Sequence, residues 1–250
     1  MEHYYFENWI QKMTISRDRF IAEVQTAYTS YEPSPETLAR MSAIGLTLVT
    51  GPAGSGKSTV MAETKLPRVV SDTIRDPRTN DGVIEIDGRE YFFRGNQLDE
   101  TLAGVRGGNY VQYALGPSRT SFYGSRAASY PEEGAALMDV VTASVPGMQE
   151  LPFGRVTPVA VIAPSHNEWI RRLDGRGTLD ADDRAARIVE ARQSLGDAIE
   201  GNYQIVVNCE LGAAAKTLLL IAEGNALSQK QQKNGRKTAE EMHRELTRAI

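Results

Sequence analysis

The stretch "LTLVTGPAGSGKST" at residues 46–59 decides the fold class of this chain. It begins with a short apolar run, typical of a buried parallel strand, and continues with a complete G-x-x-x-x-G-K-[ST] pattern from Gly51 to Ser58. The following residues can begin a helix. Strand, glycine-rich loop and helix in this order let backbone N–H groups point at a phosphate, and the helix N-terminus adds a favourable field. We therefore expect the loop to hold a nucleoside triphosphate.

The side chains of this loop have separate predicted roles. Lys57 is expected to reach the β- and γ-phosphates, and Ser58 to coordinate Mg²⁺. The predicted ATP-binding residues of the loop are Gly51, Pro52, Ala53, Gly54, Ser55, Gly56, Lys57, Ser58 and Thr59. Such loops occur in kinases, switch GTPases and mechanical ATPases alike. The sequence has no N-K-x-D pattern for reading guanine and no long insert suited to a DNA-translocating motor, which favours a kinase.

Composition sets limits on the function class. The 250 residues are enough for one or two domains with a real core. A hydrophobic share of 41% and a charged share of 24% are ordinary for a soluble globular protein. The net charge of −4 gives no global basic field for nucleic acid. The segment "SQKQQKNGRK" at 228–237 has four cations and no acid, and we interpret it as a solvated tail.

Cysteine, histidine and apolar runs give mainly negative predictions. Cys209 is the single cysteine, so no intramolecular disulfide and no cysteine-based metal cluster can form. Its apolar surroundings, "YQIVVNCE", predict a small buried residue rather than a reactive thiol. The three histidines are scattered and indicate no metal site. With no apolar segment typical of a signal peptide or a membrane span, we expect a cytoplasmic protein.

Apolar strands separated by helical segments predict a parallel α/β sheet. The predicted strands lie at 44–50, 68–71, 134–143, 156–165 and 203–208, and a hairpin is predicted at 83–93 with its turn at Asp87-Gly88. The predicted later helices lie at 167–195, interrupted at Gly175 and Gly177, and at 212–224.

The two ends of the chain differ from its centre. Residues 1–43 are predicted to form a helical extension, in which Ser34 caps a helix that begins at Pro35. Residues 225–250 are predicted to form a polar linker and a weakly amphipathic helix, whose apolar face is Ala239, Met242, Leu246 and Ile250. The sequence assigns no role to either end.

A second segment, "VVSDTIRDPRTNDGVIEIDGREYFFR" at 69–94, contains phosphate-binding chemistry. Arg75 and Arg78, three residues apart, can fork a phosphate dianion, and the hydroxyl groups of Ser71 and Tyr91 can complete its hydrogen-bond shell. Taken alone, the two arginines would be interpreted as a solvated charged loop. Together with the upstream loop and Tyr91, they favour a site for the acceptor's phosphate.

This segment resembles the acceptor-binding segment of guanylate kinases, S-x-T-T-R-x-P-R followed by E-x-x-G-x-x-Y-x-F. Further stretches resemble that family in the same order: "GNYVQYA", "FYGS", "LMDV", "VIAPS", "RRLDGRGT" and "YQIVVNCEL". The resemblance runs from about residue 45 to 223. It implies a P-loop kinase fold over residues 44–224, with a parallel-sheet core, a small mixed β NMP-binding subdomain at about 71–130 and an Arg-rich helical lid at about 168–190.

The resemblance also implies an activity, the transfer of the γ-phosphate of ATP to a purine nucleoside or deoxynucleoside monophosphate. Mg²⁺ is the implied cofactor, and a monomer or homodimer without membrane or nucleic-acid partners is expected. Lid arginines would stabilise the charge of the transition state together with Lys57. The implied catalytic set is Lys57, Arg172, Arg176 and Arg187. The implied acceptor-phosphate set is Ser71, Arg75, Arg78, Tyr91 and Tyr123.

Two further positions follow from the same resemblance. Asn208 falls where the family packs the donor's adenine. Asp139 is the one acid at the end of the predicted strand 134–143, and we expect it to bind Mg²⁺ through water, with a structural carboxylate as the alternative.

The predicted base pocket departs from the family. Gln112 replaces a glutamate that accepts hydrogen bonds from guanine, and Val141 replaces an aspartate. Ser125 remains available for a purine O6 or N7. A carboxamide has one acceptor and one donor group, which suits the edge of adenine better than that of guanine. A buried mismatch costs about 1–3 kcal/mol, enough to alter base specificity, so guanine, adenine or a modified purine stay open.

Two alternatives to this activity remain. One is a P-loop kinase for another phosphorylated acceptor, such as a modified nucleotide or a sugar phosphate. The other is a non-catalytic guanylate-kinase-like module that binds proteins. Such modules lose the loop lysine and the lid arginines, whereas this chain keeps Lys57 and Arg172, Arg176 and Arg187, so we favour the enzyme.

Overall fold

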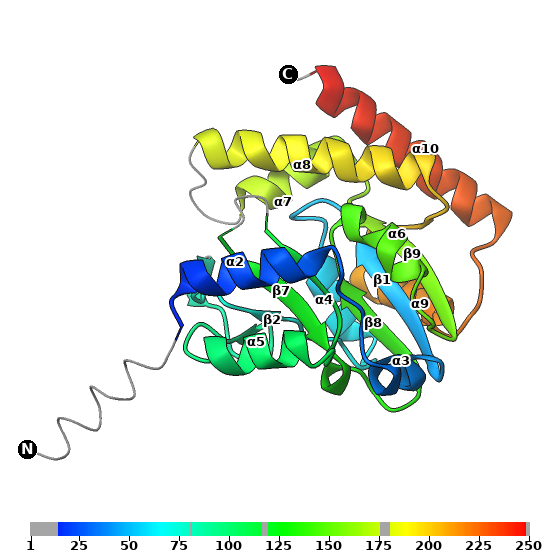
Figure 1. The fold of residues 1–250 in the computed structure, drawn as a ribbon. Helices are drawn as coiled ribbons and strands as arrows, with labels where there is room; N and C mark the ends of the chain where they lie inside the picture. Colours follow the sequence, from blue (N-terminus) through cyan, green and yellow to red (C-terminus); the bar gives the residue numbers. More distant parts are fainter. Residues whose placement is uncertain (1–14, 81, 117–119, 176–180, 249–250) are drawn as a thin grey trace, which may run out of the picture. The chain divides into compact units, whose positions relative to one another are not determined.

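The computed structural model describes residues 15–80, 82–116, 120–175 and 181–248 (Figure 1). The chain forms two compact units, each with its own sheet. The smaller combines Met1–Arg40 with Val70–Ser129, and the larger combines Met41–Val69 with Tyr130–Ile250. In the described part of the chain, no helix is long and apolar enough to cross a membrane.

The larger unit is built on a four-stranded sheet in the order β10-β9-β1-β8, in which every pairing is parallel. The strands are β1 (Ile44–Thr50), β8 (Gly134–Asp139), β9 (Arg155–Ile162) and β10 (Gln204–Val207). All but one of the β1 residues are buried, as expected for a strand covered on both faces. The predicted parallel α/β sheet is therefore confirmed.

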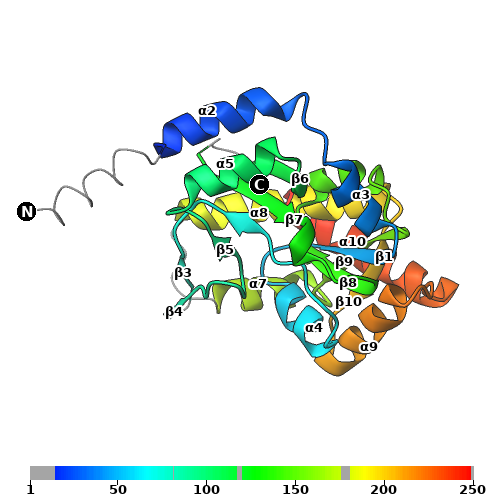
Figure 2. The same cartoon turned by 60° about the horizontal axis from the view of Figure 1, so that its bottom comes forward.

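Helices flank this sheet. On one face, α4 (Lys57–Glu63) and α9 (Leu211–Ala222) lie side by side (Figure 2) and bury apolar side chains such as Met61 and Leu218 against Val49 and Val159. The remaining helical elements of this unit are η2 (Thr142–Ser144), α6 (Val145–Gln149), α7 (His166–Asp174), α8 (Ala181–Glu200) and α10 (Gln229–Arg248). Ser165 begins α7 by accepting a hydrogen bond from the Glu168 N–H at 3.2 Å.

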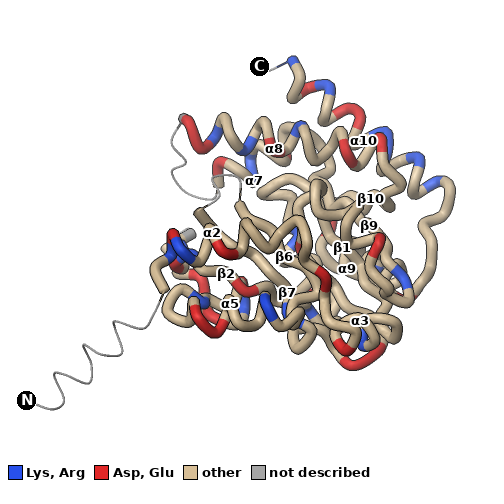
Figure 3. The backbone as a smooth tube through the Cα atoms, viewed as in Figure 1, with Lys and Arg blue, Asp and Glu red and all other residues tan. Residues whose placement is uncertain are grey.

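Helix α10 contacts α8 and the edge strand β10. Three of the four residues predicted on its apolar face, Ala239, Met242 and Leu246, are buried, and Ile250 lies outside the described residues. The prediction of a solvated tail at 228–237 was wrong, because this segment is the first half of α10 and Gly235 packs against Ile205. Its four cations, coloured blue along α10 in Figure 3, do stay exposed.

The Gln232 side chain of α10 forms hydrogen bonds with backbone groups at the edge of the sheet, as a neighbouring strand would. The Gln232 amide donates to the Tyr203 carbonyl at 2.6 Å and accepts from the Ile205 N–H at 3.4 Å. Ile205 belongs to the strand at the edge of the sheet and Tyr203 directly precedes that strand, so Gln232 satisfies one donor and one acceptor that would otherwise be open.

The smaller unit has a four-stranded mixed sheet in the order β5-β2-β7-β6. Its strands are β2 (Asp72–Thr73), β5 (Phe92–Phe93), β6 (Tyr110–Leu115) and β7 (Phe122–Arg126), with a separate pair of β3 (Thr79–Asn80) and β4 (Val83–Ile84). Strands β2 and β5 are parallel, and the other two pairings of the sheet are antiparallel.

The helical elements of this unit include part of the predicted N-terminal extension. They are α2 (Arg17–Tyr28), α3 (Pro35–Met41, whose last residue belongs to the larger unit), α5 (Leu98–Arg106) and η1 (Ala127–Ser129). Phe20 of α2 and Leu102 of α5 enter the same core as Phe122 of the sheet, so α2 belongs to the fold of this unit. Ser34 caps α3 as predicted, through a 3.2 Å bond from the Thr37 N–H.

Three local predictions were wrong. The hairpin at 83–93 does not form, because β4 pairs with β3 while β5 pairs with β2, and the Asp87 carboxylate accepts the Phe93 N–H at 2.7 Å. The strand predicted at 68–71 is reduced to an isolated bridge at Arg68. Cys209 is exposed rather than buried, because β10 ends at Val207 and the cysteine follows in a turn.

Candidate active site

The nucleotide loop of the larger unit joins β1 to α4 in a conformation that requires glycine. Gly51, Gly54 and Gly56 have φ angles of 128°, 84° and 92°. A Cβ atom at Gly51 would lie 2.2 Å from the Val161 carbonyl oxygen, and one at Gly56 would lie 2.4 Å from Asn208 Nδ2. The Val161 backbone and the Asn208 side chain therefore approach the loop too closely for a side chain at Gly51 or Gly56.

Three side chains from outside the loop hold its backbone carbonyls. Trp169 Nε1 of α7 donates to the Ala53 carbonyl at 2.7 Å, and Asn208 Nδ2 donates to the Ser55 carbonyl at 2.9 Å. The guanidinium of Arg172 reaches the Ser55 carbonyl at 3.4 Å and that of Asn208 at 3.1 Å. Arg172 and Asn208 were expected near the nucleotide, whereas no role was predicted for Trp169. The available signal was chemical, because a buried indole N–H needs a partner.

Lys57 and the predicted metal ligands lie around the same loop. Lys57 Nζ donates to the Gly51 carbonyl at 2.8 Å, while Ser58 is exposed in the first turn of α4. Asp139 ends β8, opposite Val49 of β1. Desolvation by the surrounding protein raises the pKa of Asp139 although its side chain reaches solvent, and Lys57 and Arg68 act in the opposite direction.

The predicted lid residues have different surroundings. Arg172 Nε binds Glu168 at 2.7 Å. Hydrogen bonds from Arg171 and then Arg172 lower the pKa of Glu168 to about 2. Arg187, on α8, pairs with Glu190 at 2.8 Å and is half-exposed. Arg176 lies outside the described residues.

The smaller unit brings three of the predicted acceptor-phosphate residues together. The Arg75 guanidinium lies 4.8 Å from the centre of the Tyr91 ring, and the Tyr91 and Tyr123 rings are 5.6 Å apart. The Ser71 carbonyl accepts the N–H of Phe92, the residue that follows Tyr91, at 2.9 Å. The Arg78 side chain is exposed, and its charge helps to lower the pKa of Glu85.

Arg75 already binds an oxyanion, the carboxylate of Glu85. The two bonds of this fork measure 2.5 and 2.9 Å, and the Glu85 carboxylate also accepts the Arg78 N–H at 2.8 Å. Burial acts to lower the pKa of Arg75, but the bonds to Glu85 outweigh it and raise that pKa. For Glu85, burial acts to raise the pKa, and Arg75 lowers it overall. No role was predicted for Glu85, although this residue begins the E-x-x-G-x-x-Y-x-F pattern.

The predicted base-binding residues divide between the units. Gln112 of β6 lies opposite Ser125 of β7, and Ser125 is fully buried while Gln112 is half-buried. Tyr123 and Ser125 share one face of β7, since side chains two residues apart point the same way. Val141 belongs to the larger unit and is 63% exposed.

The chain is similar in sequence to several guanylate kinases. The enzyme from Frankia casuarinae is 31% identical over 199 residues, which cover 73% of this chain and 98% of the relative. The enzyme from Streptococcus thermophilus is 34% identical over 194 residues, covering 73% and 88%. The enzyme from Dechloromonas aromatica is 28% identical over 191 residues, covering 73% and 90%.

Comparison with family models and with solved structures gives less support for this relationship. No family model matches the chain. A crystal structure of guanylate kinase from Anaplasma phagocytophilum aligns with a TM-score of 0.47 at 19% identity, covering 77% of this chain and 90% of that one. The assignment therefore depends on the sequence relatives, two of which exceed 30% identity across 73% of the chain. On that ground the chain belongs to the guanylate kinase family and is a nucleoside monophosphate kinase, a phosphotransferase.

Proposed function

We propose that this enzyme transfers the γ-phosphate of ATP to a purine nucleoside monophosphate, and that Gln112 changes which purine it prefers. The observation that carries the acceptor half is the Arg75 fork, which already binds a carboxylate beside Tyr91 and Tyr123. A guanidinium that forks a carboxylate has the geometry to fork a phosphate. The relatives named guanylate kinases support the same class of acceptor.

On the donor side, Lys57 would exchange its bonds to the Gly51 and Pro52 carbonyls for oxygens of the β- and γ-phosphates. Arg172 would hold the loop conformation through its bond to the Ser55 carbonyl, and its guanidinium would add positive charge next to the loop. Arg187 and Arg176 are the further cations that we propose for the transition state, where negative charge spreads over the transferred group. Asn208 would face the adenine side of the donor.

The donor atoms near the loop fit Mg²⁺. Ser58 has an exposed hydroxyl and Asp139 a carboxylate, and both offer the oxygen ligands that Mg²⁺ prefers. The described residues include no group of three or more His, Cys, Asp or Glu side chains placed to hold a metal ion. Mg²⁺ commonly takes one or two protein ligands and completes its shell with phosphates and water, so this sparse set suits it. The ion would neutralise charge on the phosphates.

For the acceptor, we propose that Ser71, Arg75, Arg78, Tyr91 and Tyr123 bind the 5′-phosphate and that Gln112 and Ser125 read the base. Because Ser125 is buried and lies opposite Gln112, a base that contacts both would be desolvated. Desolvation makes a mismatch between amide and base costly, about 1–3 kcal/mol. Val141, exposed in the other unit, would form no polar contact with a base.

The test is a phosphoryl-transfer assay with ATP and Mg²⁺ across GMP, dGMP, AMP, dAMP and IMP. We expect turnover of at least one purine monophosphate, and Lys57→Ala should lower it by orders of magnitude. Gln112→Glu should shift preference toward GMP by roughly tenfold or more, the equivalent of about 1.4 kcal/mol. An enzyme that phosphorylates no monophosphate refutes the proposal, and an unchanged substrate profile in Gln112→Glu refutes its base-reading part.

A further inference from the structure

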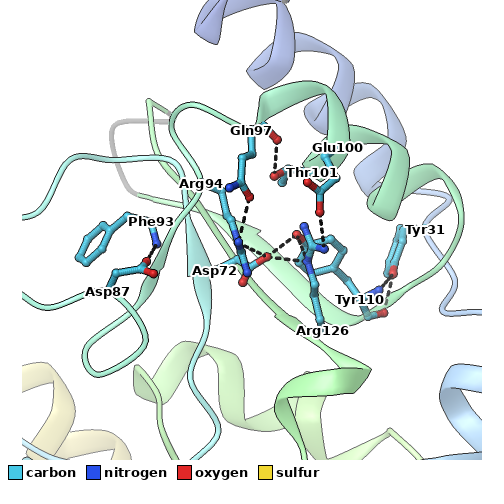
Figure 4. A network of polar contacts seen from close by, with 10 residues as sticks. All are labelled: Tyr31, Asp72, Asp87, Phe93, Arg94, Gln97, Glu100, Thr101, Tyr110 and Arg126. Carbon is cyan, nitrogen blue, oxygen red and sulfur yellow. Dashed lines mark hydrogen bonds and ion pairs between the residues drawn. The ribbon is translucent and has the colours of Figure 1, made fainter.

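A buried ionic network lies in the smaller unit, centred on Asp72 (Figure 4). The Asp72 side chain is 0% exposed, and its Oδ2 accepts hydrogen bonds from Tyr110 Oη at 2.7 Å and from Arg126 Nε at 2.6 Å. Arg94 Nε lies 3.5 Å from the same oxygen. One buried carboxylate therefore faces two guanidinium groups, and none of these residues has a part in the function proposed above.

The network connects the four strands of the sheet with α5. Asp72 is in β2, Tyr110 in β6 and Arg126 in β7, while Arg94 directly follows β5. Arg94 Nη1 donates to Gln97 at 2.8 Å, and Arg126 Nη1 reaches Glu100 of α5 at 3.4 Å. Both guanidinium groups also cover aromatic rings, Arg126 over Tyr110 at 5.2 Å and Arg94 over Phe92 at 5.1 Å.

Strand β2 needs this support because it is two residues long. Its bonds to the β5 side include those from the Phe92 N–H to the Ser71 carbonyl at 2.9 Å and from the Arg94 N–H to the Thr73 carbonyl at 2.6 Å. A two-residue strand forms few backbone hydrogen bonds. Hydrogen bonds to a charged group are roughly twice as strong as neutral ones, so the bonds of the Asp72 carboxylate compensate for this small number.

The network fixes geometry rather than maximising stability. Burying a carboxylate is unfavourable unless all its positions are satisfied. The second oxygen of Asp72, Oδ1, has no hydrogen-bond partner in the described part of the chain. An apolar side chain would fill the position with less desolvation, so what the carboxylate supplies is a directional link between β2, Tyr110 and Arg126.

The residues proposed to bind the acceptor lie on the other face of this sheet. Successive side chains of a strand alternate between faces, so Ser71 and Thr73 point away from Asp72, and Tyr123 and Ser125 point away from Arg126. Thr73 Oγ1 in turn accepts the Arg75 N–H at 3.4 Å. A shift of β2 would therefore move Ser71 and Arg75 together.

We infer that Asp72, held by Tyr110 and Arg126, is a positioning residue for the acceptor nucleotide. The inference rests on the proposed function of Ser71 and Arg75. Asp72 touches no substrate in this account, and it acts through the placement of β2. Because the ATP loop belongs to the larger unit, weakening the network should affect the acceptor and not the donor.

Two variants weaken the network at different points. Tyr110→Phe keeps the ring and removes one bond to Asp72, and Arg126→Gln removes the guanidinium. The matched control is Arg106→Gln, which breaks an exposed 2.9 Å pair with Glu23 in the same unit. For each protein, KM for ATP, KM for the acceptor and amide hydrogen exchange at residues 71–75 are measured.

We expect both network variants to raise KM for the acceptor by about tenfold or more, because small displacements of binding groups are amplified in this way. KM for ATP should stay within about twofold, exchange at 71–75 should be faster, and the control should match wild type. An unchanged acceptor KM in a folded variant, or equal rises in both KM values, overturns the inference. If Arg126→Gln does not fold, Tyr110→Phe decides the question alone.

The experiment separates this inference from the proposed function. Wild-type protein that phosphorylates no monophosphate refutes the function. In that case hydrogen exchange still decides whether the network holds β2, and exchange at 71–75 that is unaltered in Tyr110→Phe overturns the inference.

Discussion

Replacing Trp169 by phenylalanine should weaken the nucleotide loop while leaving the fold intact. The Trp169 ring is fully buried, and its N–H donates to the Ala53 carbonyl at 2.7 Å. Phenylalanine keeps an aromatic ring at this position but has no donor. The variant therefore tests whether α7 holds the loop through this one bond.

The magnitude follows from the burial of both partners. A lost hydrogen bond costs about 1 kcal/mol net, and a buried group left unsatisfied costs about 1–3 kcal/mol. Ala53 is half-buried, so water can reach its carbonyl and the lower part of that range applies. We expect an unfolding free energy lower by about 1–2 kcal/mol. If about 1 kcal/mol of it acts on the nucleotide-binding conformation, KM for ATP rises about fivefold.

The assay compares KM for ATP with KM for the acceptor, together with thermal melting. The matched control is Tyr130→Phe, which removes a hydroxyl from a buried ring of the same unit, where that hydroxyl donates to Met138 Sδ at 3.7 Å. KM for ATP should rise in the tryptophan variant alone. A lower melting temperature with unchanged KM for ATP would refute the reasoning, since the bond would then serve stability only.

Further predictions concern the ion pair between Arg75 and Glu85 and the glycines Gly56 and Gly147. Burial acts to raise the pKa of Glu85, but Arg75 lowers it below the ordinary 4.5, so the stability from this pair is full above about pH 4.5 and is lost as the pH falls through the lowered pKa. Urea unfolding should show Glu85→Gln less stable than wild type at pH 7, with the gap closing in acid; a gap independent of pH would contradict this. Gly56→Ala, with φ 92° and a contact at 2.4 Å, should lose about 1–3 kcal/mol and most activity. Gly147→Ala in α6, where a Cβ meets nothing within 4 Å, should raise the unfolding free energy by about 0.5–1 kcal/mol, measured by thermal melting. If both glycine substitutions changed the unfolding free energy equally, the loop at Gly56 would not be strained by a side chain.

The parallel sheet was predictable because a buried strand is a continuous apolar run with polar ends. The runs containing Leu48, Val159 and Val206 all became strands of it. Strand partners were not predictable in the smaller unit. Alternation at 83–93 indicates a strand but not its neighbour, and Thr79–Asn80 and Asp72–Thr73 are too short to show any pattern.

Individual polar contacts could not be predicted from the sequence for a related reason. Trp169 and Ala53 are 116 positions apart, and Asp72 and Arg126 are 54 apart, so no local pattern connects them. Cys209 was misjudged because the apolar run before it was extended past Asn208, a polar residue that marks the end of the strand. The proximity of Arg75, Tyr91 and Tyr123 was predictable because spacing within a known pattern identifies residues whose partners are remote.

The amide of Gln232 has a consequence for how this enzyme can be shortened. The family resemblance ends near residue 223, so a cut after Gly224 looks like the natural boundary of a minimal kinase. That cut would remove α10 and leave open the Ile205 N–H of the edge strand and the Tyr203 carbonyl just before it, beside an apolar surface that Met242 and Leu246 had covered. Two such molecules could then join edge to edge. We therefore expect removal of the last helix to show first as self-association rather than as lost catalysis.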